Sequence, residues 1–205
     1  MRPVVHLAFD TSAAHCAAAL LWVTDAGLRL ETRCEEMAKG QAERLLPMIE
    51  ALLAAQGLGF ADVGSLSVGT GPGNFTGIRI AVSLARGLAL GLGVPAVGVT
   101  GFQAARHAAA RQGPHWVLID APRGQVYAQR FGADQGAPMI LDPEQVAVLD
   151  APAVRLSDLS ADQIVRAVAE AGFASLSIPQ PRPAPFYLRG ADAAPPSDPP
   201  PVILP

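Results

Sequence analysis

The stretch SVGTGPGNFTGIRI, residues 67–80, predicts a short buried strand, a glycine-rich corner and the start of a helix. Gly71 and Gly73 allow backbone angles that other residues rarely adopt, and Asn74 is a favoured helix N-cap. Corners of this kind often hold a phosphate group at the N-terminus of the helix that they open. The stretch therefore raises two hypotheses: the corner binds an anion, or it only directs the helix.

The glycines of this corner do not match two motifs that bind phosphate before a helix. A Walker loop, GxxxxGK[ST], needs a lysine after its last glycine, and no lysine follows here. A dinucleotide-binding fingerprint needs GxGxxG, whereas Gly71, Gly73 and Gly77 are spaced one residue wider. The sequence therefore favours a capped helix entry, and an anion site at the corner stays the alternative.

The helix expected after this corner is apolar on nearly all sides, so it has to be covered on most of its surface. Small side chains recur every four residues along it and form one ridge: Gly77, Ala81, Ala85 and Ala89. Ser83, Gly87 and Gly91 form a second small ridge. Because small ridges let another helix approach closely, we expect one side to pack on the chain's own sheet and another to form a protein interface. A fully internal helix is the alternative.

The N-terminal half predicts three strands followed by alternating helices and strands. The expected strands lie near residues 4–9, 16–23, 28–36, 65–69 and 95–99, and the expected helices near 42–56, 74–92 and 101–112. Three successive strands followed by this alternation are typical of a ribonuclease-H-like domain, in which helices cover a mixed sheet. We place this domain at residues 1–113.

A second, shorter unit follows, in which a strand ending in Asp120 and a hairpin repeat the pattern around Asp10. Its expected elements are strands near residues 116–119, 126–131 and 139–141 and a helix near 161–171. We therefore predict a reduced ribonuclease-H-like domain at residues 114–178. A proline-rich C-terminal tail is expected at residues 179–205.

Composition argues against several classes of protein. The 205 residues are 50% apolar and 16% charged, with a net charge of −3 and no run of Lys or Arg, so the chain lacks the basic footprint of a nucleic-acid-binding protein. Cys16 and Cys34 have neither metal-binding nor redox-motif spacing. The longest apolar stretch, residues 81–99, is interrupted by Arg86 and glycines, and no signal peptide is indicated. We expect a soluble cytoplasmic protein without a membrane partner.

Five motifs fall in the same order as in the bacterial TsaB (YeaZ) family, which the sequence resembles. They are LAFDTS at residues 7–12, ERLLPMIEALL at 43–53, GTGPGNFTGIRIAVSLARGLALG at 69–91, IDAPRGQVY at 119–127 and PFYLR at 185–189. The resemblance implies an α/β architecture of the actin/hexokinase-like (ASKHA) class, built from two ribonuclease-H-like domains.

The resemblance also implies a non-catalytic role. Family members are subunits of the machinery that places threonylcarbamoyl on N6 of the adenosine 3′ of the tRNA anticodon. In that machinery TsaD binds the metal and transfers the group, and TsaE is the ATPase. TsaB pairs with TsaD, or with a second TsaB, through its first two helices. The implied partners are thus a TsaD-like subunit, a TsaE-like ATPase within the complex and a second copy when alone, with tRNA reached only through the complex and no cofactor or metal of its own.

The first two helices of the family correspond here to residues 42–56 and 74–91. The interface residues predicted on them are Leu45, Met48, Ile49, Leu52, Phe75, Gly77, Arg79, Ala81, Ala85 and Ala89. Arg79 either reaches a carboxylate of the partner or is merely solvated. The sequence departs from the family at Gln41, where a His is usual, and we find no G-x-G segment between residues 150 and 172.

An actin-like nucleotide phosphotransferase or ATPase is the alternative, because the turn after the first strand stands where such enzymes carry a phosphate loop. The candidate nucleotide-binding residues are Asp10, Thr11, Ser12, Gly71, Gly73 and Asn74. Thr11 replaces the glycine usual in such loops, so a strand-ending turn is the other interpretation. A metallopeptidase is a third hypothesis, although the four histidines show no HExxH spacing.

Overall fold

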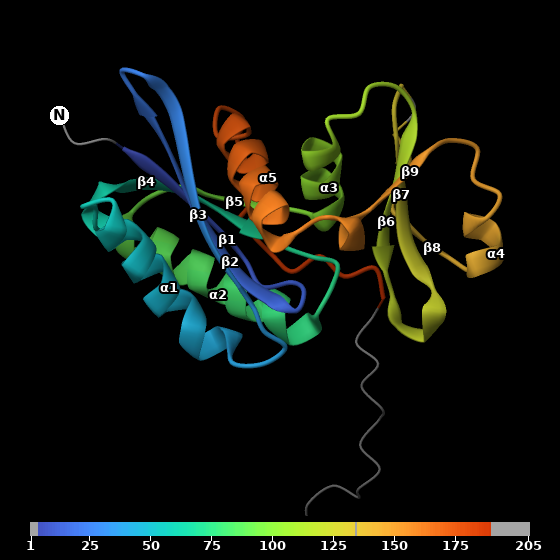
Figure 1. Ribbon diagram of the computed structural model, residues 1–205, viewed down its shortest axis with the longest axis horizontal. Coiled ribbons are helices and arrows are strands. Elements are labelled where there is room, and N and C mark those ends of the chain that lie inside the picture. Colours follow the sequence, from blue (N-terminus) through green and yellow to red (C-terminus); the bar gives the residue numbers. More distant parts are fainter. Residues whose placement is uncertain (1–3, 134, 190–205) are drawn as a thin grey trace, which may run out of the picture.

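A computed structural model describes residues 4–133 and 135–189. These residues form two sheets with helices on their faces (Figure 1). The first sheet contains β1 (Val5–Asp10), β2 (His15–Thr24), β3 (Gly27–Glu36), β4 (Val63–Gly69) and β5 (Ala96–Val99). The second contains β6 (His115–Asp120), β7 (Val126–Phe131), β8 (Met139–Leu141) and β9 (Ala153–Arg155). The helices are α1 (Gln41–Ala55), α2 (Phe75–Leu92), α3 (Gly101–Ala109), α4 (Pro143–Val146) and α5 (Ala161–Ala174).

The second sheet repeats the topology of the first. The first sheet has the strand order β3-β2-β1-β4-β5, with β2 antiparallel to both neighbours and β4 parallel to β1 and β5. The second has the order β8-β7-β6-β9, with the same directions at the first four positions. The expectation of two ribonuclease-H-like modules, the second reduced, is therefore confirmed. The residue boundaries that we assigned to them stay a prediction.

The central strands of the first sheet are buried on both faces. Leu7 and Phe9 of β1 face the core beneath α1 and α2, whereas Ala8 faces the core around α3 and α5. This alternation follows from the two-residue period of a strand. Alanines on the second face let α5 approach closely, and Gly172 of α5 lies so near Ser67 of β4 that a Cβ would collide with it.

Helix α5 joins the two modules. It comes from the C-terminal part of the chain, yet it packs against β1, β2 and β4 of the first sheet and against α3 (Figure 1). The Ser67 hydroxyl donates to the Val168 carbonyl at 2.9 Å, and the Thr32 hydroxyl donates to Asp162 at 2.5 Å. The sequence predicted this helix but did not predict α4 or β9.

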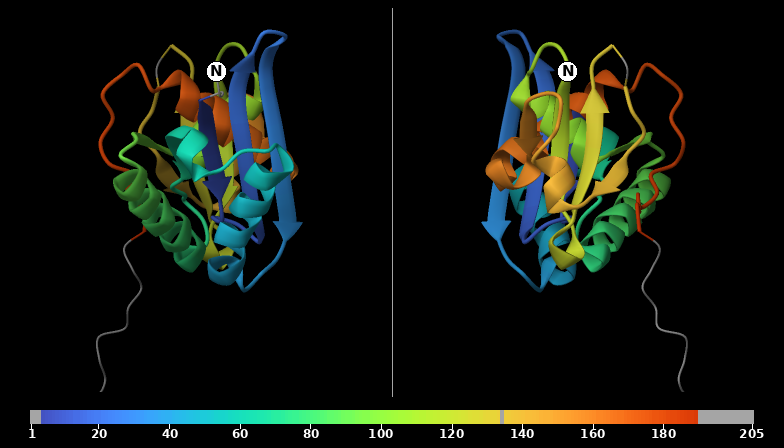
Figure 2. Two further views of the ribbon diagram at one scale, coloured as in Figure 1. Left: turned by 90° about the vertical axis from the view of Figure 1, so that its left-hand side faces the viewer. Right: turned by 90° about the vertical axis from the view of Figure 1, so that its right-hand side faces the viewer.

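Helices α1 and α2 lie side by side on the opposite face of the first sheet (Figures 1 and 2). Gln41 begins α1, is buried, and donates through Nε2 to the Met37 carbonyl at 3.0 Å, which ties the helix to the end of β3. Pro47 lies inside α1 without ending it.

The C-terminal segment returns to the first module. The Phe186 amide donates to the Thr70 carbonyl at 2.8 Å, and the Phe186 ring packs edge-on against Phe102 with centroids 6.4 Å apart. Arg189 donates to the side-chain oxygen of Gln125. The PFYLR motif therefore docks on its own chain, while residues 190–205 of the predicted tail lie outside the described residues.

Candidate protein–protein interface

The glycine-rich corner locks the start of α2 to the turn after β1. The Asn74 side chain accepts a hydrogen bond from the Gly77 amide at 3.0 Å, which confirms the predicted N-cap. The Asn74 amide donates to the Ser12 carbonyl at 2.7 Å, and the Thr11 hydroxyl donates to the Gly77 carbonyl at 2.7 Å. These bonds fix the direction in which α2 leaves the corner.

The same glycines are needed because the chain's own turn approaches them. A Cβ at Gly73 would collide with the Ser12 carbonyl oxygen, and a Cβ at Gly77 would collide with the Thr11 carbonyl oxygen. Carbonyl oxygens carry negative partial charge, so they disfavour an anion at this place. The geometry therefore favours the hypothesis that the corner directs the helix over the hypothesis that it binds a phosphate.

Asp10 is held within a buried hydrogen-bond cluster. Its Oδ2 accepts from the Ser12 amide at 3.1 Å, from the Ser12 hydroxyl at 3.0 Å and from Nε2 of His15 at 2.6 Å. Gly69 leaves room for this carboxylate, because a Cβ there would collide with it. Sequence reasoning missed His15, whose side chain meets Asp10 only because β2 folds back beside β1. The Ser12 hydroxyl points to a carboxylate rather than to an imidazole, which is not the arrangement of an activated serine.

A cavity of about 510 Å³ lies between the ends of the two modules. Ser12 and Asn74 line one side, and Asp120 and Tyr127 line the other. Among the described residues that line it, none is Lys or Arg. The cavity thus brings several candidate nucleotide-binding residues together but offers no cation to a phosphate chain, which binding sites for nucleotides usually supply.

The four histidines lie in separate places with separate partners. His6 contacts Ser65 and Ser67, whereas His107 contacts Glu170. The other two are His15, already described, and His115, which lies 2.9 Å from the Gly113 carbonyl. Within residues 4–133 and 135–189, no three His, Cys, Asp or Glu side chains gather as a potential metal site.

Most of the predicted interface residues are buried in the chain itself, which corrects that assignment. Seven of them belong to the core under α1 and α2 or are buried beside it: Leu45, Met48, Ile49, Leu52, Gly77, Ala81 and Ala85. The ridge of Gly77, Ala81 and Ala85 lets α2 approach its own sheet rather than a foreign helix. A helix that is apolar all round does not reveal from its sequence which face meets the sheet.

The outer side of α2 carries the second small ridge instead. Ser83, Gly87 and Gly91 are exposed, and a Cβ built on either glycine meets nothing within 4 Å. Leu90 beside them is 85% exposed. Together with Leu46, Pro47 and Ala54 of α1, which are also exposed, these four α2 residues form a surface that we call the pairing face. Of the remaining predicted interface residues, Phe75 and Arg79 are exposed and Ala89 is partly buried.

Helix α2 is long and apolar enough, by length and composition alone, to cross a membrane. This window, residues 75–92, only overlaps the stretch at residues 81–99, and the expectation of no membrane partner stays a prediction. The inner side of the same helix packs on β4 of its own sheet, through Ile78 and Val82 among others. Only 28% of residues 75–92 is buried in the chain. The apolar surface that stays exposed on α2 therefore requires an explanation.

Arg79 is held by two aromatic rings at the beginning of α2. Its guanidinium carbon lies 3.6 Å from the centroid of the Phe75 ring, and its Nε donates to the Tyr187 hydroxyl at 3.0 Å. The two rings are 5.0 Å apart. Arg79 has no acidic partner within the part of the chain that the structure describes. It is therefore ordered rather than merely solvated, and its remaining N–H groups are free to bind a partner.

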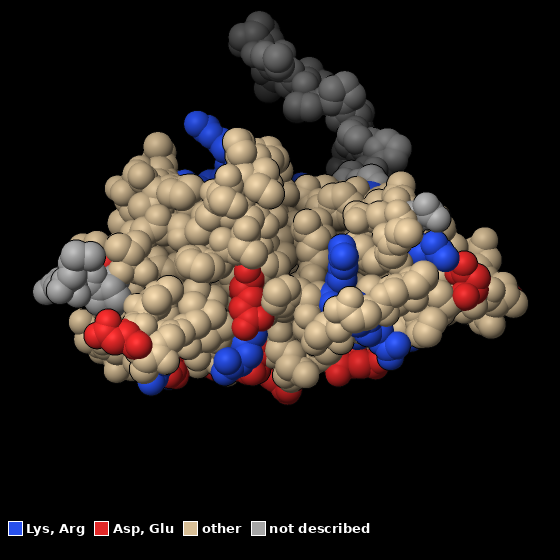
Figure 3. Space-filling model, turned by 90° about the horizontal axis from the view of Figure 1, so that it is seen from above, with Lys and Arg blue, Asp and Glu red and all other residues tan. Residues whose placement is uncertain are grey.

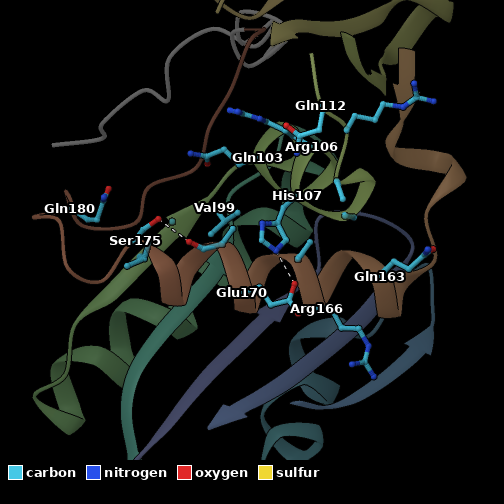
Figure 4. Close-up of a pocket in the computed structure, with 17 residues that line it drawn as sticks. Val99, Gln103, Arg106, His107, Gln112, Gln163, Arg166, Glu170, Ser175 and Gln180 are labelled. Atoms are coloured by element: carbon cyan, nitrogen blue, oxygen red, sulfur yellow. Dashed lines mark hydrogen bonds and ion pairs between the residues drawn. The ribbon is translucent and has the colours of Figure 1, made fainter. Parts of the chain in front are cut away.

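Two further cavities lie away from the corner. One of about 700 Å³ adjoins the end of α2 and is lined by Leu90, Val94 and Ile178, so it continues the pairing face. The other, of about 810 Å³, lies between α3 and α5. There His107 and Glu170 point toward each other, with Nε2 and Oε2 2.8 Å apart, whereas Arg166 points away from the cavity (Figure 4).

The basic residues at the cavity between α3 and α5 do not point toward a common place. The Arg106 guanidinium lies over the Phe131 ring, 4.9 Å from its centroid, and Arg166 pairs with Asp162 at 2.8 Å. Side chains of both signs are interspersed on the face seen from above, without a broad basic patch (Figure 3). This face therefore lacks the electrostatic footprint that nucleic-acid binding requires.

Known proteins resemble this chain in both sequence and structure. Two proteins described as tRNA threonylcarbamoyladenosine biosynthesis protein TsaB, from Haemophilus influenzae and Escherichia coli, are 37% and 36% identical over 62% and 63% of this chain. The structure of YeaZ from Pseudomonas aeruginosa matches with a TM-score of 0.71 at 27% identity, covering 90% of this chain and 99% of that chain. A family model described as "TsaD: tRNA N6-adenosine threonylcarbamoyltransferase" matches residues 34–194. The chain belongs to the TsaB (YeaZ) family.

Membership of the TsaB family confirms the ASKHA-like fold expected from the sequence. The matched regions cover 53% and 55% of the two TsaB proteins, so the chain spans about half the length of these relatives. An uncharacterized protein of Mycobacterium bovis is 33% identical over 175 residues, which are 77% of this chain and 79% of that protein.

Proposed function

We propose that this chain is a non-catalytic assembly subunit in tRNA threonylcarbamoyladenosine biosynthesis, and that it supports a TsaD-like catalytic subunit by pairing with it. The observation that carries the proposal is the outer side of α2, where an apolar helix fixed at its N-terminus leaves Gly87, Leu90 and Gly91 exposed. Exposed small residues let a second helix approach closely. Such a surface is typical of a helix-packing interface.

The proposed complex also contains a TsaE-like ATPase and contacts tRNA through its assembled surface, and we place it in the cytoplasm. Basic and acidic side chains are interspersed on the face shown in Figure 3, and the net charge is −3. Both observations support an indirect contact with tRNA rather than binding by this chain alone. The alternative of a nucleotide-binding phosphotransferase has less support, because the described lining of the cleft near Asp10 lacks Lys and Arg.

Co-purification tests the proposal. The chain and the TsaD homologue of the same organism are expressed together and analysed by size-exclusion chromatography. We expect them to elute as one complex and expect Gly87→Arg to separate them, because the long side chain prevents close helix packing. Gln112→Arg, at an exposed position after α3, is the control and should leave the complex intact.

Activity provides the second measurement. Threonylcarbamoyl transfer to tRNA by the reconstituted subunits should require the wild-type chain and fail with Gly87→Arg. Two outcomes contradict the proposal: the wild-type chain elutes apart from the TsaD homologue, or Gly87→Arg binds it as tightly as the wild type. Turnover of a nucleotide or peptide by the isolated chain would likewise exclude a non-catalytic role.

A further inference from the structure

We infer that the cavity of about 700 Å³ at the end of α2 binds the C-terminal tail of this same chain, residues 190–205, which lie outside the described residues. We call this cavity the tail groove. The inference goes beyond the proposed function, because its occupant belongs to the chain itself and docking can be measured on the isolated protein. It depends on the apolar lining of the groove, on two arginines and on the sequence of the tail.

Two segments that are distant in the sequence line the tail groove. One lies within residues 86–97, from the end of α2 into β5, and the other lies within residues 176–183, which follow α5. Figure 2 shows the second segment, in red, passing beside α2. Cavities of about 300–1,000 Å³ are typical of sites that bury most of a bound ligand. The groove is therefore large enough for several side chains of a peptide.

The groove leaves large apolar side chains uncovered. Leu90 of α2 is 85% exposed, and Ile178 of the other segment is 60% exposed. Val94 and Leu176, which are partly buried, complete this apolar lining. Exposed apolar side chains that share one hollow are typical of a binding site for an apolar segment.

The charges at the groove favour an acidic occupant. Arg86 and Arg182 line it, and none of its described lining residues is Asp or Glu. Both arginines are exposed, and neither has an ionic partner within residues 4–133 and 135–189. Complementary charge stabilises an acidic segment at this place, whereas a basic segment is repelled.

The tail combines the two properties that the groove requires. Asp192 and Asp198 are the only charged residues in its sequence, GADAAPPSDPPPVILP, and its only large aliphatic side chains form one stretch at residues 202–204. The tail thus offers negative charge followed by an apolar stretch. Its six prolines restrict the free chain, so less conformational entropy is lost when the tail docks.

The tail is long enough to reach the groove. Pro183 lines the groove, and Arg189, the last described residue, follows it by six residues, so the two lie at most about 22 Å apart. Thirteen residues lead from Arg189 to Val202, and they span about 40 Å as polyproline II. The aliphatic stretch can therefore return to the groove without movement of any helix or strand.

Docking has a consequence for the pairing face. Gly87 and Leu90 belong to both the pairing face and the tail groove. A docked tail therefore covers one end of the surface on which the partner helix is proposed to pack, and the tail and the partner compete. This consequence, unlike docking itself, rests on the proposed function.

A labelled peptide tests docking on the full-length chain. The tail variant, Val202→Ser/Ile203→Ser/Leu204→Ser, loses the aliphatic stretch and keeps the groove. Fluorescence anisotropy measures the affinity of each chain for a fluorescent peptide of residues 190–205. We expect the tail variant to bind it at least about tenfold tighter than the wild type, because the wild-type tail is tethered at a millimolar effective concentration and displaces the peptide.

A matched control changes the tail without changing the aliphatic stretch. Ala191→Ser/Ala193→Ser/Ala194→Ser also introduces three serines into the tail, and this control should bind the peptide as weakly as the wild type does.

Two further measurements establish where the peptide binds and whether docking is intramolecular. Arg182→Glu, added to the tail variant, should weaken peptide binding about threefold, and a peptide with Asp198→Arg should recover the affinity. In NMR spectra the methyl resonances of Leu90 and Ile178 should differ between the wild type and the tail variant. This difference should persist at every protein concentration, because a tethered tail docks within one chain.

Four outcomes would overturn docking. The peptide binds the tail variant no tighter than the wild type, Arg182→Glu leaves peptide binding unchanged, or the methyl resonances do not respond to the tail substitutions. In the fourth, the response vanishes on dilution, which would place the tail in the groove of a second copy.

Competition is measured separately with the TsaD homologue. The tail variant should bind it severalfold tighter than the wild type does, and equal affinities would disprove competition. If the TsaD homologue binds neither chain while the peptide results hold, the proposed function fails and docking of the tail stands.

Discussion

Thr11 and Gly77 touch across the corner that begins α2. The Thr11 hydroxyl donates to the Gly77 carbonyl at 2.7 Å, and the Thr11 carbonyl oxygen occupies the space where a Cβ of residue 77 would lie. The turn after β1 and the helix after β4 are thereby joined, although they are far apart in the sequence. This contact sets the position of α2 and hence of the pairing face.

A methyl group at this contact should therefore destabilise the protein. We expect Gly77→Ala to lower the free energy of unfolding by about 1–3 kcal/mol, because the new Cβ meets backbone that can move only with the turn. Gly87→Ala, in the same helix, is the matched control, since its Cβ would meet nothing within 4 Å. Relative to glycine, alanine there should stabilise the helix by up to about 1 kcal/mol. Urea unfolding measures both, and equal effects of the two substitutions would contradict the close contact at Gly77.

A charge on the buried ridge should unfold the chain rather than only prevent pairing. Ala81 is 0% exposed, so we expect Ala81→Glu to cost about 3 kcal/mol or more by burying an unpaired carboxylate. Thermal unfolding followed by circular dichroism measures this loss, with Ser83→Glu on the exposed side as the control. A folded, stable Ala81→Glu protein that no longer pairs would show that the inner ridge is the interface after all.

His6 should make the stability depend on pH below neutrality. Its ring is buried between Ser65 and Ser67, and burial lowers the pKa of His6 from 6.5 to about 4. Between these values the unfolded chain binds a proton that the folded chain does not, so stability is full above pH 6.5 and falls as the pH drops toward 4. At pH 4 this proton uptake lowers the free energy of unfolding by about 3 kcal/mol relative to neutral pH.

Urea unfolding at several pH values between 4 and 7 measures this dependence. We expect His6→Asn to reduce its slope. An unaltered slope in His6→Asn would mean that the acid sensitivity comes from other groups.

The two cysteines should react slowly with thiol reagents. Burial, with a smaller effect of the nearby Glu35 carboxylate on Cys16, raises the pKa of the Cys16 thiol to about 11, and burial raises the pKa of Cys34 to about 11 as well. From a starting pKa of 9.0, the thiolate fraction at pH 8 falls about a hundredfold. Absorbance assays with an aromatic disulfide reagent should show slow labelling that accelerates in urea. Equally fast labelling of folded and unfolded protein would contradict the assigned burial.

Local patterns in the sequence were sufficient to predict most of the fold. The apolar runs of β1 and β2, the helical spacing in α1 and α2 and the Asn74 cap all depend on neighbouring residues, and the structure confirms each of them. The short elements α4 and β9 were missed because three or four residues carry too little periodicity to be recognised.

The site was predicted less completely, because it depends on residues that are distant in the sequence. The partnership of His15 with Asp10 arises from the pairing of β1 with β2, and the stack on Arg79 uses Tyr187 from the C-terminal segment. No spacing rule connects such residues. The resemblance to the TsaB family located the two helices but not the side of each helix that faces outward.

The sequence by itself determined that α2 is a capped, apolar helix with two small ridges, and it determined the family. Only the tertiary structure decided which ridge is buried: Ala81 and Ala85 face the sheet, and Ser83 and Gly87 face outward. The physical reason is that both ridges consist of small side chains, so the size of the side chains does not say which ridge faces the sheet. The bonds of Thr11 and Ser12 to the beginning of α2 set its rotation, and those contacts exist only once β1 and β4 lie side by side.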